Sequence, residues 1–190
     1  MPTALPDVPI AVASLATPWG PAVVAASVDG IHAIALLADE SNLSASVVRR
    51  TRRPIVAPTR APGPIARAIR DTIDDLDRYV ADGARFGGWR RPVALLGVSD
   101  WDVRVLSAVA AIPVGTTASY GMVAQAAGSP GAARAAGGAV GRNPAGLVVP
   151  CHRVIAGDGT IGGYGGSWSD DREALVELKR SLLAHEGVEL

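Results

Sequence analysis

The chain holds a single cysteine, and the residues beside it are ones that can make a thiol reactive. Cys151 stands in the run Pro150-Cys151-His152-Arg153. A lone cysteine is most often a small buried apolar side chain, so composition alone favours a structural role. A nearby base or positive charge, however, lowers the thiol pKa of about 8.5 and yields the nucleophilic thiolate. We therefore predict a nucleophile at Cys151, with His152 serving through a bridging water and a carboxylate elsewhere orienting its ring.

The segments around the cysteine suit a ligand pocket. The apolar run Leu147-Val148-Val149 predicts a strand that leads directly into Pro150. Downstream, Gly157-Asp158-Gly159 and Gly162 to Gly166 predict flexible loops, and Tyr164 lies within the second loop. Loops with one aromatic side chain are suited to closing over a flat ligand.

Composition limits the classes of function. The 190 residues carry a formal net charge of zero with a pI near 6.8, which argues against a large non-specific nucleic-acid binder but leaves room for a small local patch. Seventeen of the 18 basic residues are arginines, which fits a GC-rich coding sequence. One cysteine excludes an internal disulfide and a cysteine-rich zinc site, so we expect no metal and no cofactor. Without a basic leader or a membrane-length apolar run, a cytoplasmic protein is expected.

The first half of the chain predicts a small sheet followed by a helix. Residues 8–37 alternate apolar runs with turn signals such as Asp29-Gly30 and predict two or three antiparallel strands. Residues 38–63, which contain the basic run Arg49 to Arg53, predict loop with one short strand near Ile55. Helical spacing of isoleucine and leucine predicts a helix over 64–81. Glycines and Pro92 in 82–99 indicate a linker and a domain boundary.

The second half predicts a pair of short helices joined by a glycine turn. A helix over 103–112 stops at Pro113, and Ser119 is a suitable N-cap for a helix over 120–127. After Gly128-Ser129-Pro130-Gly131, a second short helix is expected over 132–140, which completes a helix-turn-helix pattern. Its only long side chain is Arg134. The paired Gly137 and Gly138 cost about 1 kcal/mol each in a helix, which suggests that its backbone approaches another surface. A solvent-facing glycine-rich loop is the alternative.

Several blocks follow one another in an order and spacing that resemble one family. The blocks are Ile112-Pro113, Gly115-Thr116, Ser119-Tyr120-Gly121, Arg134, Gly137-Gly138, Gly141-Arg142-Asn143-Pro144, Val149 to Val154, Gly163 to Gly166, and Leu182-Leu183-Ala184-His185-Glu186-Gly187. Together they closely resemble the O6-alkylguanine-DNA alkyltransferases, also called methylated-DNA–protein-cysteine methyltransferases. The resemblance is strong over 97–166 and 179–187 and looser over 1–90.

The resemblance implies a reaction and a role for each matching residue. The family transfers an alkyl group from O6 of guanine to its own cysteine in a single turnover. O4-alkylthymine is a second candidate lesion. Cys151 would accept the group, His152 would take the thiol proton through water, Glu186 would orient His152, and Asn143 would brace the active-site turn. The lesion must be flipped out of duplex DNA, which would be the partner of a monomeric protein.

The same resemblance implies the contacts with DNA and with the flipped base. Arg134 would enter the stack in place of the base, while Gly137 and Gly138 let the helix lie close to the minor groove. Tyr120 would donate its hydroxyl to the base. The pocket would be formed by Tyr164, Val154, Gly165 and Gly166. The implied fold is α+β, with a ribonuclease H-like α/β support domain over 1–90 and a mainly helical alkyltransferase domain with a winged helix-turn-helix-like motif over 91–190.

The chain departs from the family at points that leave alternatives open. Trp101-Asp102 and Val105-Leu106 replace Phe-Gln and Val-Trp, which we interpret as exchanges in packing. The stretch from Ser167 to Leu178 is about eight residues longer than usual, so Glu173 or Glu177 could replace Glu186 as the carboxylate, although the intact setting favours Glu186. A non-catalytic lesion-binding protein, a DNA-binding regulator and a thiol hydrolase are the competing functions. Cys151-His152 argues against the first two, and no oxyanion-hole motif supports the third.

Overall fold

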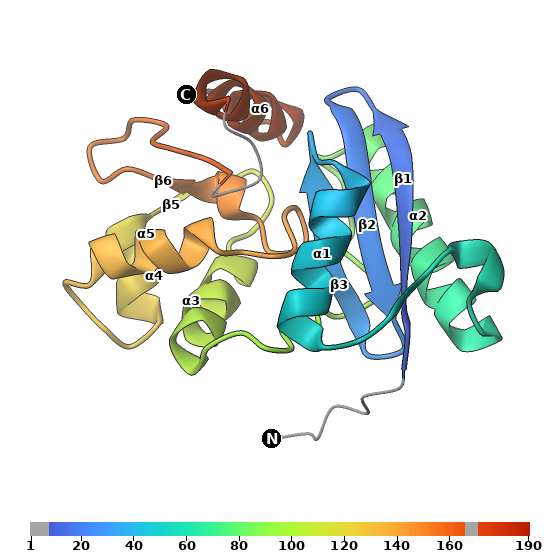
Figure 1. Ribbon diagram of the computed structural model, residues 1–190. Coiled ribbons are helices and arrows are strands. Elements are labelled where there is room, and N and C mark those ends of the chain that lie inside the picture. Colours follow the sequence, from blue (N-terminus) through green and yellow to red (C-terminus); the bar gives the residue numbers. More distant parts are fainter. Residues whose placement is uncertain (1–7, 166–170) are drawn as a thin grey trace. The chain divides into compact units, whose positions relative to one another are not determined.

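The computed structural model describes residues 8–165 and 171–190, which form two compact units. Unit 1 comprises residues up to Val80 together with Gly87–Val98, and unit 2 comprises Ala81–Phe86 together with Ser99–Leu190. The architecture is mixed α and β, with a small sheet in unit 1 and six α-helices in the described part of the chain (Figure 1). In the same part, no helix is long and apolar enough to cross a membrane.

Unit 1 is built on a four-stranded sheet with the strand order β3-β2-β1-β4. The strands β1 (Ile10–Thr17), β2 (Gly20–Ser27) and β3 (Gly30–Leu36) form an antiparallel meander, as the alternation over 8–37 predicted, and β4 (Ile55–Val56) runs parallel to β1. Gly20 and Gly30 take positive φ values of 105° and 129° in the two tight turns. All seven residues of β3 are buried, so both faces of the sheet are covered at this strand.

Two helices flank this sheet on opposite faces (Figure 1). Helix α2 (Gly63–Ala81) was predicted, but α1 (Glu40–Thr51) was not, because 38–63 was interpreted as loop with one strand. Asp39 caps α1 by accepting a hydrogen bond from the Asn42 amide. Val47 of α1 packs in the core of the sheet. The prediction for 38–63 was therefore wrong for α1 and right for the strand at Ile55.

The segment Gly87–Val98, taken from sequence as a linker, is tied to unit 1. Asp75 of α2 is buried and accepts hydrogen bonds from the Arg90 amide at 2.7 Å, Arg90 Nε at 2.5 Å and Arg78 Nη2 at 2.6 Å. The backbone of Ile31 exchanges hydrogen bonds with Pro92 and Ala94 at the edge of β3. These bonds give the segment a fixed place on α2 and β3.

Unit 2 contains the four remaining helices and a short parallel pair of strands. The helices are α3 (Asp100–Ala110), α4 (Tyr120–Ala126), α5 (Ala133–Gly141) and α6 (Arg172–His185), and β5 (Ala118–Ser119) pairs with β6 (Val154–Ile155). Ser119 caps α4, as predicted, by accepting from the Met122 amide. The predicted pair of helices joined by a glycine turn corresponds to α4 and α5.

One departure from the predicted pattern has a structural partner within unit 2. Asp102 of α3 is largely buried and binds Arg142 with two hydrogen bonds of 2.9 and 2.7 Å. The substitution at Asp102 is therefore more than an exchange in packing, because it creates an ion pair that holds the end of α5. Arg142 directly precedes Asn143, so the pair stabilises the chain just before the active-site turn.

Candidate active site of unit 2

Cys151 opens a short 3₁₀ turn, Cys151–Arg153, which leads into β6. The preceding run Leu147-Val148-Val149 forms turns, so the prediction of a strand there was wrong. Leu147 has a φ of 66°, and the Val148 amide donates to Gly146 O at 2.8 Å, which reverses the chain within three residues. The cysteine is therefore presented by a sequence of tight turns.

Asn143 holds these turns together. Its Nδ2 donates to Val149 O at 2.7 Å, and its Oδ1 accepts from the Ala145 amide at 3.1 Å. The Cys151 amide donates to the same Val149 carbonyl at 2.7 Å. Because Asn143 is buried with both ends of its amide satisfied, it fixes the backbone on which the cysteine stands.

His152 and Glu186 lie side by side in the interior of unit 2. His152 Nε2 and Glu186 Oε1 are 2.9 Å apart, and neither side chain is exposed. Glu173 and Glu177, the alternatives considered from the sequence, are exposed near the start of α6, and Glu177 pairs with Arg180. Among these three carboxylates, the structure brings Glu186 to the histidine.

The ionisation states of this pair determine which nitrogen of the histidine is free to accept a proton. Burial alone would raise the Glu186 pKa, but hydrogen bonds from His152 and Arg153 outweigh it and lower the pKa to about 2. Burial lowers the pKa of His152, so its ring is neutral at neutral pH. An ionised carboxylate only accepts, so the proton is on Nε2 and Nδ1 is the acceptor. Nδ1 is buried and has no hydrogen-bond partner within the described residues.

Arg153, which follows His152 in the sequence, does not supply the positive charge that was expected to lower the pKa of the Cys151 thiol. It binds Glu186 through Nε at 2.7 Å and Nη2 at 2.9 Å, and its Nη1 donates to Ile112 O at 2.5 Å. Burial raises the pKa of the Cys151 thiol, opposed by hydrogen bonds from Asn143 and Tyr164 and by the charge of Lys179. A neighbouring positive charge does lower the thiol pKa, but it comes from Lys179 instead of Arg153, and burial outweighs it, so the resting group is a thiol.

Sequence reasoning missed Lys179, the only lysine of the chain. It lies on α6 and is completely buried, and its ammonium group donates to Val154 O at 2.6 Å, Ile161 O at 2.5 Å and Gly163 O at 3.2 Å. Burial lowers its pKa to about 8. Its place seven residues, or two helical turns, before Glu186 was the available signal, since residues at this spacing share one face of a helix. Lys179 ties the loop after the cysteine to α6.

The loop held by Lys179 brings the predicted pocket residues towards the thiol. Tyr164 is half-buried and hydrogen-bonds to Cys151. Gly165 has a φ of 87°, and a Cβ there would lie 2.7 Å from Leu175. Val154 is buried, with its amide bonded to Cys151 O and its carbonyl to Lys179. Gly166 was also predicted to line the pocket and lies outside the described residues.

The residues predicted to contact DNA lie on α4 and α5. Arg134 and Gly138 are exposed on α5, whereas Gly137 is half-buried and faces the ring of Tyr120, where a Cβ would lie 3.6 Å from Cδ1. Tyr120 begins α4, and burial together with the nearby Cys151 raises its pKa, so its hydroxyl keeps its proton. A Cβ at Gly137 would therefore make an ordinary van der Waals contact with Tyr120, and the exposed face of α5 carries Arg134 and small residues. In the described residues, no cluster of three or more His, Cys, Asp or Glu side chains is placed to hold a metal ion.

Comparisons with known proteins place this site in a family. Residues 100–188 match the model of the DNA-binding domain of 6-O-methylguanine DNA methyltransferase. A methylated-DNA–protein-cysteine methyltransferase of Mycobacterium bovis is 51% identical over 83 residues, and one of Methanothermobacter thermautotrophicus is 42% identical over 123 residues. These alignments cover 44% and 65% of the chain, and 50% and 64% of the two relatives, so the chain spans about half the length of the mycobacterial relative that it matches.

Solved structures extend the likeness over most of the chain. Mycobacterium tuberculosis OGT in complex with DNA is 30% identical with a TM-score of 0.69, and the match covers 93% of each chain. The O6-methylguanine methyltransferase of the same organism is 31% identical with a TM-score of 0.64, over 90% of this chain and 93% of that one. On the match of the site-bearing unit and of the whole chain, this protein belongs to the methylated-DNA–protein-cysteine methyltransferase family.

Proposed function

We propose that the protein repairs O6-alkylguanine in duplex DNA by transferring the alkyl group to Cys151 in a single turnover. The observation that carries the proposal is the arrangement of Cys151 beside a neutral, buried His152 whose Nε2 is bonded to the ionised Glu186. That arrangement leaves His152 Nδ1 as a base beside a thiol that keeps its proton until substrate is bound. O4-alkylthymine is a second candidate substrate of the same chemistry.

The transfer balances with groups of the protein and the DNA alone. The thiol proton passes through a bridging water to Nδ1 of His152, and Glu186 stabilises the imidazolium that forms. The thiolate attacks the saturated carbon on O6, so that a carbon–sulfur bond forms as the carbon–oxygen bond breaks. The electron pair stays on the guanine, whose developing negative charge the Tyr120 hydroxyl stabilises by donating a hydrogen bond. The thioether formed at Cys151 has no route back, so each molecule reacts once.

We assign the remaining site residues to holding this geometry. Asn143 braces the turn that presents the thiol through its bond to Val149 O, and its interaction with Cys151 lowers the thiol pKa, which favours the thiolate. Tyr164 and Gly165 form a wall of the base pocket, and the backbone of Val154 contacts the guanine edge. We also assign Lys179 to this group, because it holds the carbonyls of Val154, Ile161 and Gly163 in one place.

DNA binding is assigned to α4 and α5 of unit 2. Arg134 is exposed on a helix whose other exposed residues are small, which suits close approach to a minor groove and entry of one long side chain into the base stack. Gly137 and Gly138, which have no side chains, permit that approach. The likeness to an OGT that was solved with DNA supports this assignment.

The finer description of the fold follows from the same proposal. We assign residues 1–90 to a ribonuclease H-like support domain, and 91–190 to an alkyltransferase domain with a winged helix-turn-helix-like motif. The protein would act as a monomer in the cytoplasm, because one copy of the chain carries every group that the transfer uses. A protein that only binds the lesion would not need Cys151 beside His152 and Glu186.

The test is the intact mass of the protein after incubation with a duplex that carries one O6-methylguanine. We expect the mass to rise by one methyl group in place of a proton, and peptide mapping to place the methyl group on Cys151. Cys151→Ala should show no gain while still binding the duplex. An unchanged mass in the native protein would contradict the proposal and leave lesion binding as the function.

A second experiment examines the role of Arg134 in base flipping. Arg134→Ala should slow methyl transfer from duplex DNA by roughly tenfold or more, since unstacking a base costs a few kcal/mol. Reaction with a free-base analogue, which needs no flipping, should keep its rate. Equal slowing of both reactions would remove Arg134 from this role.

A further inference from the structure

The chain of unit 1 between Glu40 and Asp71 contains arginines and no acidic residue. The seven arginines are Arg49, Arg50, Arg52, Arg53, Arg60, Arg67 and Arg70. Over its whole sequence, unit 1 has ten basic and eight acidic residues, whereas unit 2 has eight basic and ten acidic residues. The positive charge of the protein is therefore concentrated outside unit 2, which carries the helices α4 and α5 that we assign to DNA binding.

Two of the seven arginines have roles in the fold of unit 1. Arg50 donates to Leu96 O at 2.7 Å and to His32 O at 2.8 Å, and the buried Arg53 pairs with Asp29. The other five are exposed, and their guanidinium groups form no hydrogen bond or ion pair within residues 8–165 and 171–190. The side chains of these five (Arg49, Arg52, Arg60, Arg67 and Arg70) are the unpaired arginines of unit 1.

Helix stability does not account for this set. The helix dipole favours arginines at the C-terminal end of α1, which explains Arg49 and the C-cap residue Arg52 but none of the other three. Arg67 and Arg70 lie beyond the first turn of α2, where the helix dipole does not favour them, and the first turn holds no acidic residue that would offset their charge. The positive end of α2 therefore adds to the field of the arginines instead of opposing it.

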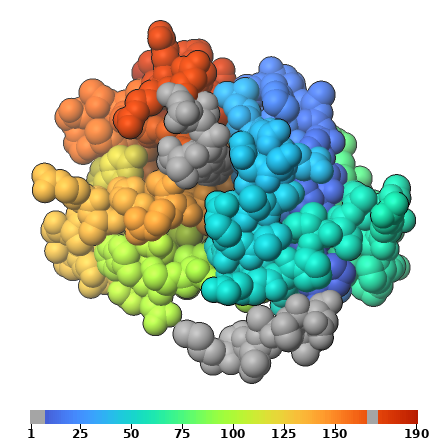
Figure 2. Space-filling view, viewed as in Figure 1, coloured from blue at the N-terminus to red at the C-terminus, as the bar shows by residue number. Residues whose placement is uncertain are grey.

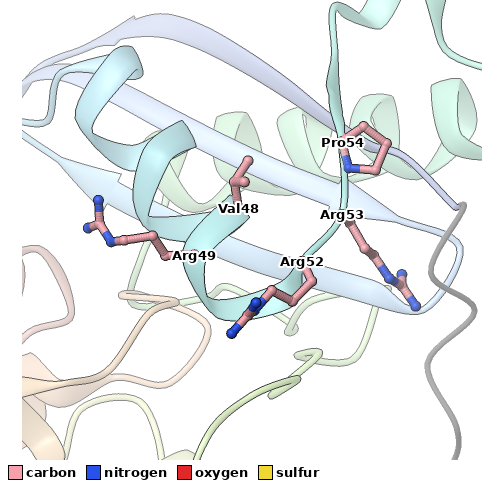
Figure 3. A pocket seen from close by; sticks show the side chains of 5 residues that line it. All are labelled: Val48, Arg49, Arg52, Arg53 and Pro54. Carbon is pink, nitrogen blue, oxygen red and sulfur yellow. The ribbon is translucent and has the colours of Figure 1, made fainter.

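The shape of the surface indicates what kind of anion it fits. A hollow of about 640 Å³ beside the end of α1 is lined by Val48, Arg49, Arg52, Arg53 and Pro54. Its three guanidinium groups point in different directions instead of converging on one point (Figure 3). The chain from α1 to the start of α2 also forms a continuous part of the visible surface of unit 1 (Figure 2). Spread charges over a continuous surface suit a row of phosphates better than one bound anion.

We propose that the unpaired arginines of unit 1 form a second DNA-contacting surface, which binds backbone phosphates of duplex DNA without reading sequence or lesion. Duplex DNA presents one phosphate charge per ~1.7 Å of its axis, and each neutralised phosphate releases condensed counterions. Unit 2, with its net negative charge, repels a polyanion at long range, so the long-range attraction to DNA comes from unit 1. This role goes beyond alkyl transfer and gives the support unit a function of its own.

The test measures binding of the full-length protein to an undamaged duplex as a function of salt. Two double variants remove charge from the proposed surface, Arg49→Gln with Arg52→Gln and Arg67→Gln with Arg70→Gln. The control, Arg85→Gln with Arg180→Gln, removes the same charge from two exposed arginines of unit 2 that pair with Asp82 and Glu177. In each surface variant, the negative slope of log affinity against log salt concentration should become less steep by about 2. The affinity at low salt should fall roughly tenfold.

Other outcomes overturn the proposal. An equal loss in the control would mean that total charge alone matters, and unchanged binding in both surface variants would exclude a DNA contact there. Loss of self-association in sedimentation, with DNA binding intact, would assign the surface to a second copy. Reaction with a free-base analogue should be unchanged in all three variants. Since the duplex is undamaged, failure of methyl transfer in the native protein would leave this result standing.

Discussion

Each unit of the protein contains one fully buried histidine, and only one of the two belongs to a site that can do chemistry. We call the group of Ser27, Asp29, His32, Arg50 and Arg53 in unit 1 the His32 cluster. The His152 cluster of unit 2 contains Cys151, His152, Arg153, Lys179 and Glu186. Each histidine is bonded through Nε2, has an Nδ1 without a partner in the described chain, and lies among two cationic side chains.

The two clusters differ in what the Nε2 atom contacts. In unit 1 the partner is the Ser27 hydroxyl at 2.8 Å, and the carboxylate of Asp29 lies beyond it with its side chain 41% exposed. In unit 2 the partner is the carboxylate of Glu186, which is fully buried. A buried carboxylate fixes the tautomer of the ring and stabilises the imidazolium, whereas a hydroxyl gives it no counter-charge.

The comparison shows that a buried histidine with a free nitrogen is not enough to mark a site. Burial lowers the pKa of both rings, for His32 to about 4, so both are neutral at neutral pH. What distinguishes His152 is a counter-charge on one side and a thiol beside it in the chain. The ionised Glu186 is in turn held by the two hydrogen bonds of Arg153.

Removing the counter-charge should make the two clusters alike and have the largest effect. Glu186→Gln takes away the carboxylate of His152 and leaves Arg153 buried without its partner. We expect methyl transfer to slow by roughly 100-fold or more and unfolding to require ~3 to 5 kcal/mol less. Single-turnover kinetics and urea unfolding measure the two effects. Glu173→Gln, at an exposed position on the same helix, is the control, and an equal loss there would move the carboxylate role away from Glu186.

Substitution of Lys179 should have a smaller effect than that of Glu186. Lys179 contacts the loop of 154–163, and its removal leaves the hydrogen bond between His152 and Glu186 in place. Lys179→Met keeps the length of the side chain and removes the donors to three carbonyls. We expect a loss of ~3 kcal/mol of stability and faster hydrogen exchange in 154–165, since buried carbonyls lose their partners. The thiol pKa should also rise, because the charge of Lys179 lowers it.

The control for Lys179 is its neighbour in the sequence. Arg180→Met changes an exposed side chain that pairs with Glu177, and it should leave exchange in the loop unchanged. If Lys179→Met alters stability but neither the exchange of 154–165 nor the pH profile of thiol alkylation, then Lys179 supports α6 alone.

The sequence predicted elements whose signal is local and missed those that depend on distant partners. The turn Asp29-Gly30, the cap at Ser119 and the spacing in α2 each act within a few residues, and all three were confirmed. Helix α1 was missed because few of its residues are buried and Arg50 reaches segments 18 and 46 residues away. The strand expected at Leu147 failed because Asn143 closes that run into turns.

The same distinction applies to the site. Cys151, His152 and Asn143 lie within ten consecutive residues, and their types and spacing carried the prediction. The bonds of Lys179 and those of Arg153 to Glu186 join segments 16 to 33 residues apart, and their partners cannot be read from a local pattern, although the helical spacing of Lys179 and Glu186 is visible in the sequence. The resemblance to a family identified Glu186 as the carboxylate. It did not predict that the hydrogen bonds of Arg153 keep Glu186 ionised.

The His32 cluster yields the smallest effect, a dependence of unit 1 on pH. His32 faces Arg50 and Arg53, which lower its pKa further after burial, and Asp29, which raises it. As the pH falls below about 6.5, the unfolded chain takes up a proton that folded His32 does not bind until about pH 4. Stability is therefore lost on acidification, by ~2 kcal/mol between pH 7 and pH 5. Hydrogen exchange of peptides from β2 and β3 at the two pH values measures this loss.

His32→Gln, which keeps a hydrogen-bonding partner for Ser27 and does not titrate, should remove most of the dependence of this exchange on pH. His185→Gln removes a histidine from unit 2 and should leave the exchange of β2 and β3 as in the native protein. If acidification speeds the hydrogen exchange of β2 and β3 in His32→Gln as much as in the native protein, another group in unit 1 takes up the proton.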